Sequence, residues 1–84
     1  MDIIWDEEKN QRLLLERGVS FEEISDIILG DRYLDVLENP VRDGQLYFIV
    51  TIRDYTWVVP FLIDEEERMV LKTAFPSRKY HKEY

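Results

Sequence analysis

The local pattern that decides the fold of this chain is the stretch Gly18-Val19-Ser20-Phe21-Glu22-Glu23-Ile24. Gly18 favours the left-handed conformation that commonly ends a helix. Ser20 and Glu23 have the spacing of a capping box, and Val19 and Ile24 have that of the hydrophobic staple which accompanies it. The stretch therefore predicts that one helix ends and a second helix begins within three residues.

The residues on either side of this stretch extend both helices. Asp6 is a suitable cap for the first helix, with acidic residues in its first turn, and we expect this helix to run to about Arg17. A short strand over residues 2–5 precedes it. In the second helix, Ile24, Ile27 and Ile28 recur at helical spacing, and Gly30 closes it. Two helices joined so tightly predict an αα-hairpin.

From residue 32 onward the pattern changes to that of strands. We expect strands over residues 33–37, 46–53, 56–63 and 68–75, separated by a loop at 39–44, a tight turn at 54–55 and a charged turn at 64–67. Pro60 cannot donate to a ladder, so its strand is expected at an edge or at a bulge. The predicted class is α+β in a single domain, residues 1–84: a short strand, an αα-hairpin, an antiparallel meander of about four strands and a short basic carboxyl-terminal segment. If that segment forms a helix, Ser77 is its expected cap.

Composition excludes several kinds of site. The 84 residues include no cysteine and a single histidine, His81, which excludes disulfides, thiolate metal sites and multi-histidine zinc sites. The acidic run at 64–67 is more typical of a solvated turn than of a cation site. No stretch has the character of a signal peptide or is long enough to span a bilayer. We therefore expect a cytoplasmic protein with no cofactor, no metal and no membrane partner.

The charge is distributed unevenly along the chain. The net charge is −7, from 11 basic and 18 acidic residues. Residues 70–84 nevertheless carry four basic residues against one acidic, a net +3, while the rest carries −10. This segment interleaves cations and aromatic residues with the only histidine, as expected of a surface that holds a phosphate backbone and stacks bases. From composition alone, an ordinary solvated tail whose aromatic residues pack on the sheet remains the alternative.

The chemistry of these side chains suggests roles in RNA cleavage. Lysine and arginine pair with phosphate oxygens, and a histidine can move a proton to or from a ribose 2′-hydroxyl. The candidate catalytic residues are Lys72, Arg78, Lys79 and His81. Tyr80, Lys82 and Tyr84 are candidates for RNA binding, although two tyrosines four residues apart also fit the packed face of a terminal helix.

Three pieces of the chain resemble the BrnT family of type II toxins, whose fold is similar to that of RelE-type ribonucleases. They are Trp5-Asp6-x-x-Lys9, the turn Arg17-Gly18-Val19-Ser20-Phe21-Glu22-Glu23, and a closing segment with Lys72-Thr73-Ala74 followed by Ser77-Arg78-Lys79 and a final tyrosine. The chain departs from the family's pattern at Leu13, where members often carry Asn, and at Lys72-Thr73-Ala74, where Ser-Ala-Arg is more usual.

The resemblance implies a metal-independent endoribonuclease that cleaves mRNA and inhibits translation. It also implies a ribbon-helix-helix antitoxin encoded by the neighbouring gene, which forms a hetero-oligomer with the toxin. Lys9 then becomes a candidate for RNA binding, or else a solvated lysine on an exposed part of its helix. The alternative hypothesis is a non-catalytic binding module of the same fold that docks a basic partner.

Overall fold

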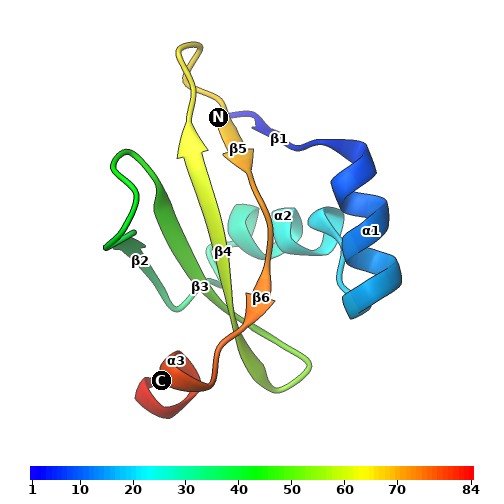
Figure 1. The fold of residues 1–84 in the computed structure, drawn as a ribbon, viewed down its shortest axis with the longest axis vertical. Helices are drawn as coiled ribbons and strands as arrows, with labels where there is room; N and C mark the ends of the chain where they lie inside the picture. Colours follow the sequence, from blue (N-terminus) through cyan, green and yellow to red (C-terminus); the bar gives the residue numbers. More distant parts are fainter.

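The computed structural model describes all residues from 1 to 84 as three helices and a six-stranded sheet (Figure 1). In chain order the elements are β1 (Ile3–Ile4), α1 (Glu7–Arg17), α2 (Phe21–Leu29), β2 (Asp35–Glu38), β3 (Leu46–Ile52), β4 (Tyr55–Ile63), β5 (Met69–Leu71), β6 (Phe75–Pro76) and α3 (Arg78–Glu83). None of the helices is both long enough and apolar enough to cross a membrane.

The sheet has the order β1-β5-β4-β3-β2, with β6 paired to β4 beyond the end of β5. Strands β2 to β5 form an antiparallel meander, and β1 joins its edge parallel to β5. The predicted α+β class, with its early strand, two helices and four-stranded meander, is therefore confirmed. The helix caps are confirmed as well, since Asp6 accepts from the amides of Glu8 and Lys9, and Ser20 accepts from that of Glu23.

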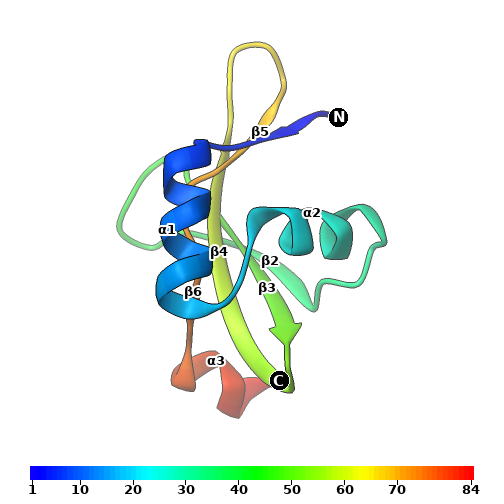
Figure 2. The same cartoon turned by 90° about the vertical axis from the view of Figure 1, so that its right-hand side faces the viewer.

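The two helices are joined by residues 18–20, but they lie crosswise instead of side by side (Figure 2). Gly18 takes the expected left-handed conformation, with φ of 69°. The end of α2 differs from the prediction. Gly30 has φ of −86°, and the next residue, Asp31, takes the left-handed conformation with φ of 54°. The amide of Arg32 reaches the carbonyl of Ile27, as in a Schellman motif with an aspartate in the place usually taken by glycine.

The tight turn between β3 and β4 lies one residue earlier than predicted. Ile52 pairs with Tyr55, so the loop consists of Arg53 and Asp54. Both have positive φ, 50° and 64°, as a two-residue type I′ turn requires. The turn was predicted one residue too late because neither Arg53 nor Asp54 is glycine, the residue that most readily takes a positive φ. Aspartate also tolerates this conformation.

Pro60 lies in a central strand, and the predicted single strand over residues 68–75 is broken opposite it. Phe61 pairs with Leu71, whereas Val58 pairs with Phe75, so three residues, 72–74, lie opposite two. This is the bulge that the proline predicted, but it lies on the neighbouring strand. The carbonyl of Pro60 accepts from the amide of Lys72, so it points toward the broken strand. The nitrogen of Pro60 points to the same side. The missing N–H of Pro60 therefore removes no hydrogen bond to β3.

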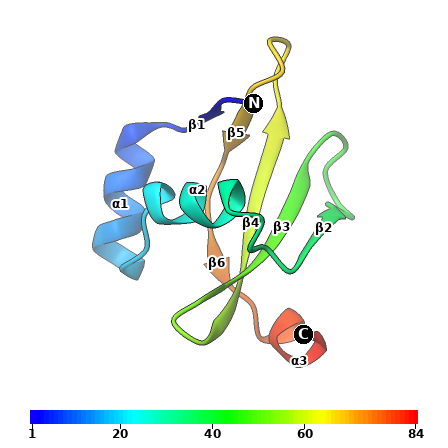
Figure 3. The ribbon, with the colours of Figure 1, turned by 180° about the vertical axis from the view of Figure 1, so that it is seen from behind.

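The two faces of the sheet are covered differently. Helix α2 crosses one face of the sheet (Figure 3). On this face, alternate residues of β3 and β4, including Phe48, Val50 and Val59, belong to a core of 14 buried residues that also includes residues of both helices. Leu13 lies in this core, which accounts for an apolar residue where the resembled family often carries Asn. On the opposite face, Ile49 is fully buried and α3 contacts β4, but the neighbouring part of this face is open. The candidate site lies on that open part.

Candidate functional site

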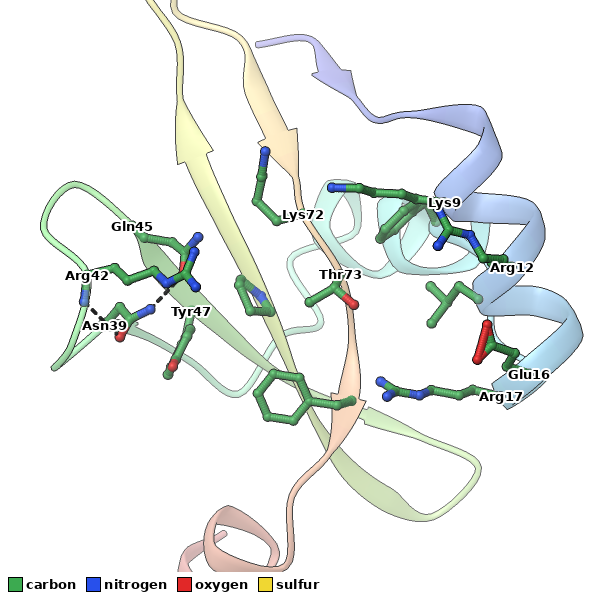
Figure 4. A pocket seen from close by; sticks show the side chains of 14 residues that line it. Lys9, Arg12, Glu16, Arg17, Asn39, Arg42, Gln45, Tyr47, Lys72 and Thr73 are labelled. Carbon is green, nitrogen blue, oxygen red and sulfur yellow. Dashed lines mark hydrogen bonds between the residues drawn. The ribbon is translucent and has the colours of Figure 1, made fainter.

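A groove of about 540 Å³ lies on the open face of the sheet, between α1 and the β2–β3 connection (Figure 4). We call it the basic groove, and its volume is typical of ligand sites. It is lined by 14 residues: Lys9, Arg12, Leu13, Glu16, Arg17, Phe21, Asn39, Arg42, Gln45, Tyr47, Pro60, Lys72, Thr73 and Phe75. One wall is α1, the other is the connection between β2 and β3, and the floor is formed by the sheet and the break between β5 and β6.

The charge of the basic groove is opposite to that of the whole protein. Its lining includes five basic residues and one acidic residue, a net +4, so the remainder of the chain carries −11. The three ion pairs in the structure are Arg53–Glu23, Arg68–Asp64 and Arg68–Glu66, and none involves a groove residue. Five cations that share a groove without a carboxylate partner, in a protein rich in carboxylates, form a site for an anionic ligand.

The wall formed by α1 follows from helical spacing. Lys9, Arg12 and Glu16 are three and four residues apart, which places them on one face of the helix. The buried Asn10 fixes this helix against the start of α2. Its Oδ1 accepts from the amide of Phe21 at 2.7 Å, and its Nδ2 donates to Glu22 Oε1 at 2.6 Å. Asn10 therefore sets the position of the cations beside it.

The floor depends on the broken strand. The amide of Lys72 donates to the carbonyl of Pro60 at 2.9 Å, which places Lys72 at the start of the bulge. Arg17 crosses from the end of α1 and donates to the carbonyl of Ala74 at the other end of the bulge. Figure 4 shows the Lys72 and Thr73 side chains between the two walls. The bulge that breaks the predicted strand thus supplies groove residues.

The second wall is held by a pair of amide side chains. Asn39 Nδ2 donates to Gln45 Oε1 at 2.6 Å, and the backbone amide of Asn39 donates to the carbonyl of Gln45 at 3.0 Å. Asn39 Oδ1 accepts from the amides of Val41 and Arg42 at 2.9 and 3.3 Å. These bonds order a loop that would otherwise be free to move and carry Arg42 to the side of the groove opposite α1 (Figure 4).

The structure divides the residues predicted as site residues into two groups. Lys9 and Lys72 line the basic groove. The others lie on α3 and do not line it: Arg78, Lys79, Tyr80, His81, Lys82 and Tyr84. The predicted cap of this helix is confirmed, because Ser77 Oγ accepts from the amide of Tyr80 at 3.2 Å.

Two polar side chains at this end of the chain, His81 and Tyr84, dock α3 on the sheet. His81 stacks on Tyr55 with ring centroids 4.1 Å apart, and its Nδ1 lies 3.1 Å from the Thr56 hydroxyl. The Tyr84 hydroxyl donates to Asp35 at 2.6 Å. This hydrogen bond lowers the pKa of Asp35 and raises the pKa of Tyr84 to about 12. These contacts give His81 and Tyr84 structural roles, at a place where neither faces the groove.

Sequence reasoning missed most of the groove. Arg12, Arg17 and Arg42 were not singled out, nor were the polar residues Asn39, Gln45 and Tyr47. The spacing of Lys9, Arg12 and Glu16 along a helix was a signal that could have been found. The contribution of Arg42 depends on the sheet, because it brings residues 39–45 opposite α1.

The sequence matches no protein-family model and no curated protein. The structure, in contrast, is similar to a solved crystal structure, that of the Brucella abortus ribonuclease toxin BrnT, with a TM-score of 0.68 and 23% sequence identity. The similarity covers 92% of this chain and 96% of the other. The chain has the BrnT fold. The expected resemblance to the BrnT family is therefore confirmed at the level of the fold, over nearly the whole chain.

Proposed function

We propose that this protein is a ribonuclease toxin of a type II toxin–antitoxin pair and that it cleaves mRNA in the basic groove without a metal ion. The observation that carries the proposal is the set of five unpaired cations converging on an open face of a BrnT fold. A polyanion is the ligand that such a surface suits, and the protein's overall charge of −7 restricts that binding to the groove. The mRNA target implies action in the cytoplasm.

The reaction needs groups of three kinds. A base removes the proton of a ribose 2′-hydroxyl, the 2′-oxygen attacks the adjacent phosphorus, and the bond to the 5′-oxygen breaks. An acid then protonates that leaving oxygen, so the products are a 2′,3′-cyclic phosphate and a 5′-hydroxyl. Cations stabilise the charge that develops on the phosphoryl oxygens. No redox step or co-reactant is required.

The basic groove contains candidates for each role. Glu16 is its sole carboxylate and is the candidate base. Lys9 and Lys72 are candidate acids for the leaving oxygen. Arg12, on the wall formed by α1, can hold the phosphate with paired donors. Since Arg78, Lys79 and His81 do not line the groove, the proposal moves the chemistry from α3 to these residues.

The antitoxin is proposed to dock outside the groove. The residues that do not line the groove carry a net charge of −11, which suits a basic partner and steers its association. The resemblance suggests a ribbon-helix-helix protein encoded beside this one. Such a partner would form a hetero-oligomer with the toxin.

The test uses the purified protein and RNA in EDTA. Cleavage that leaves 2′,3′-cyclic phosphate ends, together with growth arrest on induction that the neighbouring gene relieves, supports the proposal. If folded protein binds the neighbouring gene product but neither cleaves RNA nor arrests growth, the protein is instead a non-catalytic binding module of the same fold.

A further inference from the structure

The amide pair on the second wall of the basic groove determines which groups that wall offers to a ligand. Asn39 Oδ1 is fixed by two backbone donors, the amides of Val41 and Arg42. Its Nδ2 must therefore face Gln45, where it donates to Oε1 at 2.6 Å. Because Oε1 of Gln45 is taken in this way, the Nε2 group of Gln45 is left without a protein partner.

The free groups of this wall are therefore donors. Gln45 offers the two hydrogens of Nε2, and Arg42 offers a guanidinium, which has donors only. Neither side chain donates to another protein group. Tyr47, in β3, provides a ring in the floor on which a base can stack.

A wall of donors discriminates between the two purines. Guanine presents two adjacent acceptors, N7 and O6, on one edge, whereas adenine presents N7 beside the N6 amino donor. Adenine in the same position would place its amino group against Gln45 Nε2 or Arg42, donor against donor. An unstacked base in single-stranded RNA exposes this edge, so it can be read without a duplex groove.

We infer that the Asn39–Gln45 pair makes the basic groove selective for guanine over adenine in single-stranded RNA, with Asn39 as the positioning residue and Gln45 and Arg42 as the reading residues. This inference rests on the proposed RNA-binding function. It assigns the β2–β3 connection to base recognition and α1 with Lys72 to the phosphate backbone.

Asn39 is expected to determine the selectivity between the bases although its side chain need not touch the base. In Asn39→Asp the second carboxylate oxygen can only accept, so Gln45 must turn its Nε2 toward it and present Oε1 to the groove. The wall then contains an acceptor, although Gln45 itself is unchanged. Gln45→Met removes the donor at similar size and without a change of charge. Val41→Asp, at a side chain that is 86% exposed, adds the same charge to the same loop as a control.

The experiment measures binding of fluorescein-labelled pentanucleotides in EDTA by fluorescence anisotropy. The probes are four uridines around a central guanosine or a central adenosine, with 2′-fluoro riboses so that no cleavage occurs. We expect wild-type protein and Val41→Asp to prefer the guanosine probe by about tenfold. We expect the ratio to fall close to one in Asn39→Asp and Gln45→Met. A ratio of affinities cancels the uniform effect of the added charge.

The other outcomes separate the two proposals. Two results would overturn the proposed recognition of guanine by this pair: equal binding of both probes by the wild type, or a guanosine preference that survives in both Asn39→Asp and Gln45→Met. Neither result would contradict RNA binding in the basic groove. If folded wild-type protein binds neither probe, the proposed function fails and the recognition fails with it.

Discussion

Two regions of this molecule are rich in cations, and they are built in opposite ways. The basic groove takes its five basic residues from three separate parts of the chain, and none of them is ion-paired. The helix α3 takes its cations Arg78, Lys79 and Lys82 from one short run at the carboxyl terminus, and they are not ion-paired either. This run is docked on the sheet by other side chains, through His81 to Thr56 and through Tyr84 to Asp35.

This difference shows that a run of basic residues along the sequence and a cluster of basic residues in the folded protein are separate features. A short run of basic residues is easily seen in a sequence, and on α3 it accompanies a helix that docks on the sheet. The groove is less visible in the sequence, because Lys9, Arg42 and Lys72 are each an isolated basic residue with no basic neighbour. The fold brings them together over an open surface, which is what an anionic ligand requires.

The largest effect is expected from removing groove cations. Lys9→Ala with Lys72→Ala should reduce RNA cleavage by at least about 100-fold, because preorganised cations that stabilise a developing charge each contribute this much or more. The matched variant Arg78→Ala with Lys79→Ala removes the same amount of charge from α3 and should leave cleavage within a few-fold of wild type. The measurement is the initial rate of cleavage of a labelled RNA in EDTA.

Circular dichroism of both double variants provides the control for folding. The proposal is contradicted if Arg78→Ala with Lys79→Ala abolishes cleavage in folded protein while Lys9→Ala with Lys72→Ala leaves it intact. The cations needed for cleavage would then lie on α3 and not in the basic groove.

Whether Asn10 holds α1 and its groove cations in place can be tested without replacing any of these cations. Asn10→Ala leaves the amide of Phe21 without its partner, a buried loss that we expect to lower the free energy of unfolding by about 2–3 kcal/mol. Leu15→Ala on the same helix, at an 85% exposed side chain, should change it by less than about 0.5 kcal/mol. Urea unfolding followed by tryptophan fluorescence measures both. An equal stability for the two variants would show that Asn10 does not hold α1 in place.

A smaller effect is expected from His81. His81→Ala removes the stack on Tyr55 and the hydrogen bond to Thr56, and it should lower the free energy of unfolding by about 1 kcal/mol. The rate of RNA cleavage at a temperature where the variant is folded should stay close to that of wild type, as it should for the exposed neighbour Lys82→Ala. A loss of cleavage of 100-fold or more in stable protein would restore His81 as a catalytic residue.

The smallest effect concerns the pH dependence of the docking of α3. The pKa of Asp35 is lowered from 3.8, so its bond to Tyr84 contributes stability above that pH and loses it as the pH falls through the lowered value. The pKa of Tyr84 is raised from 10 to about 12, so the contribution is complete below pH 10 and is lost as the pH rises toward 12.

The stability difference between wild type and Tyr84→Phe should therefore be constant between these limits and vanish at both ends. Thermal unfolding of the two proteins across the pH range measures it. A difference that grows as the pH falls below 3.8 would contradict the assigned bond.

The sequence predicted the fold better than the site because the fold is specified by local signals. The caps at Asp6, Ser20 and Ser77 and the strand that begins at Leu46 depend on neighbouring residues, and the structure confirms them. The left-handed Asp31 and the turn at Arg53 were missed because they lack glycine. The break opposite Pro60 was foreseen as a bulge, but only the pairing of strands shows which strand carries it.

The site required information that no local pattern contains. Lys9 and Lys72 were found through a motif and a basic run, respectively. Arg42 and Gln45 become groove residues only when the β2–β3 connection lies opposite α1, and the free donor on Gln45 follows from a hydrogen-bond network around Asn39. His81 drew attention as the sole histidine, whereas its neighbours in space, Tyr55 and Thr56, give it a docking role.

Whether RNA binds in the basic groove can be tested directly by titrating the isotope-labelled protein with a 2′-fluoro oligonucleotide and recording two-dimensional amide NMR spectra. The groove account predicts the largest chemical-shift changes at Lys9, Arg12 and Lys72 and in the loop around Arg42, with little change over α3. Changes confined to residues 78–84, with the groove signals unmoved, would contradict it and assign RNA binding to the terminal helix.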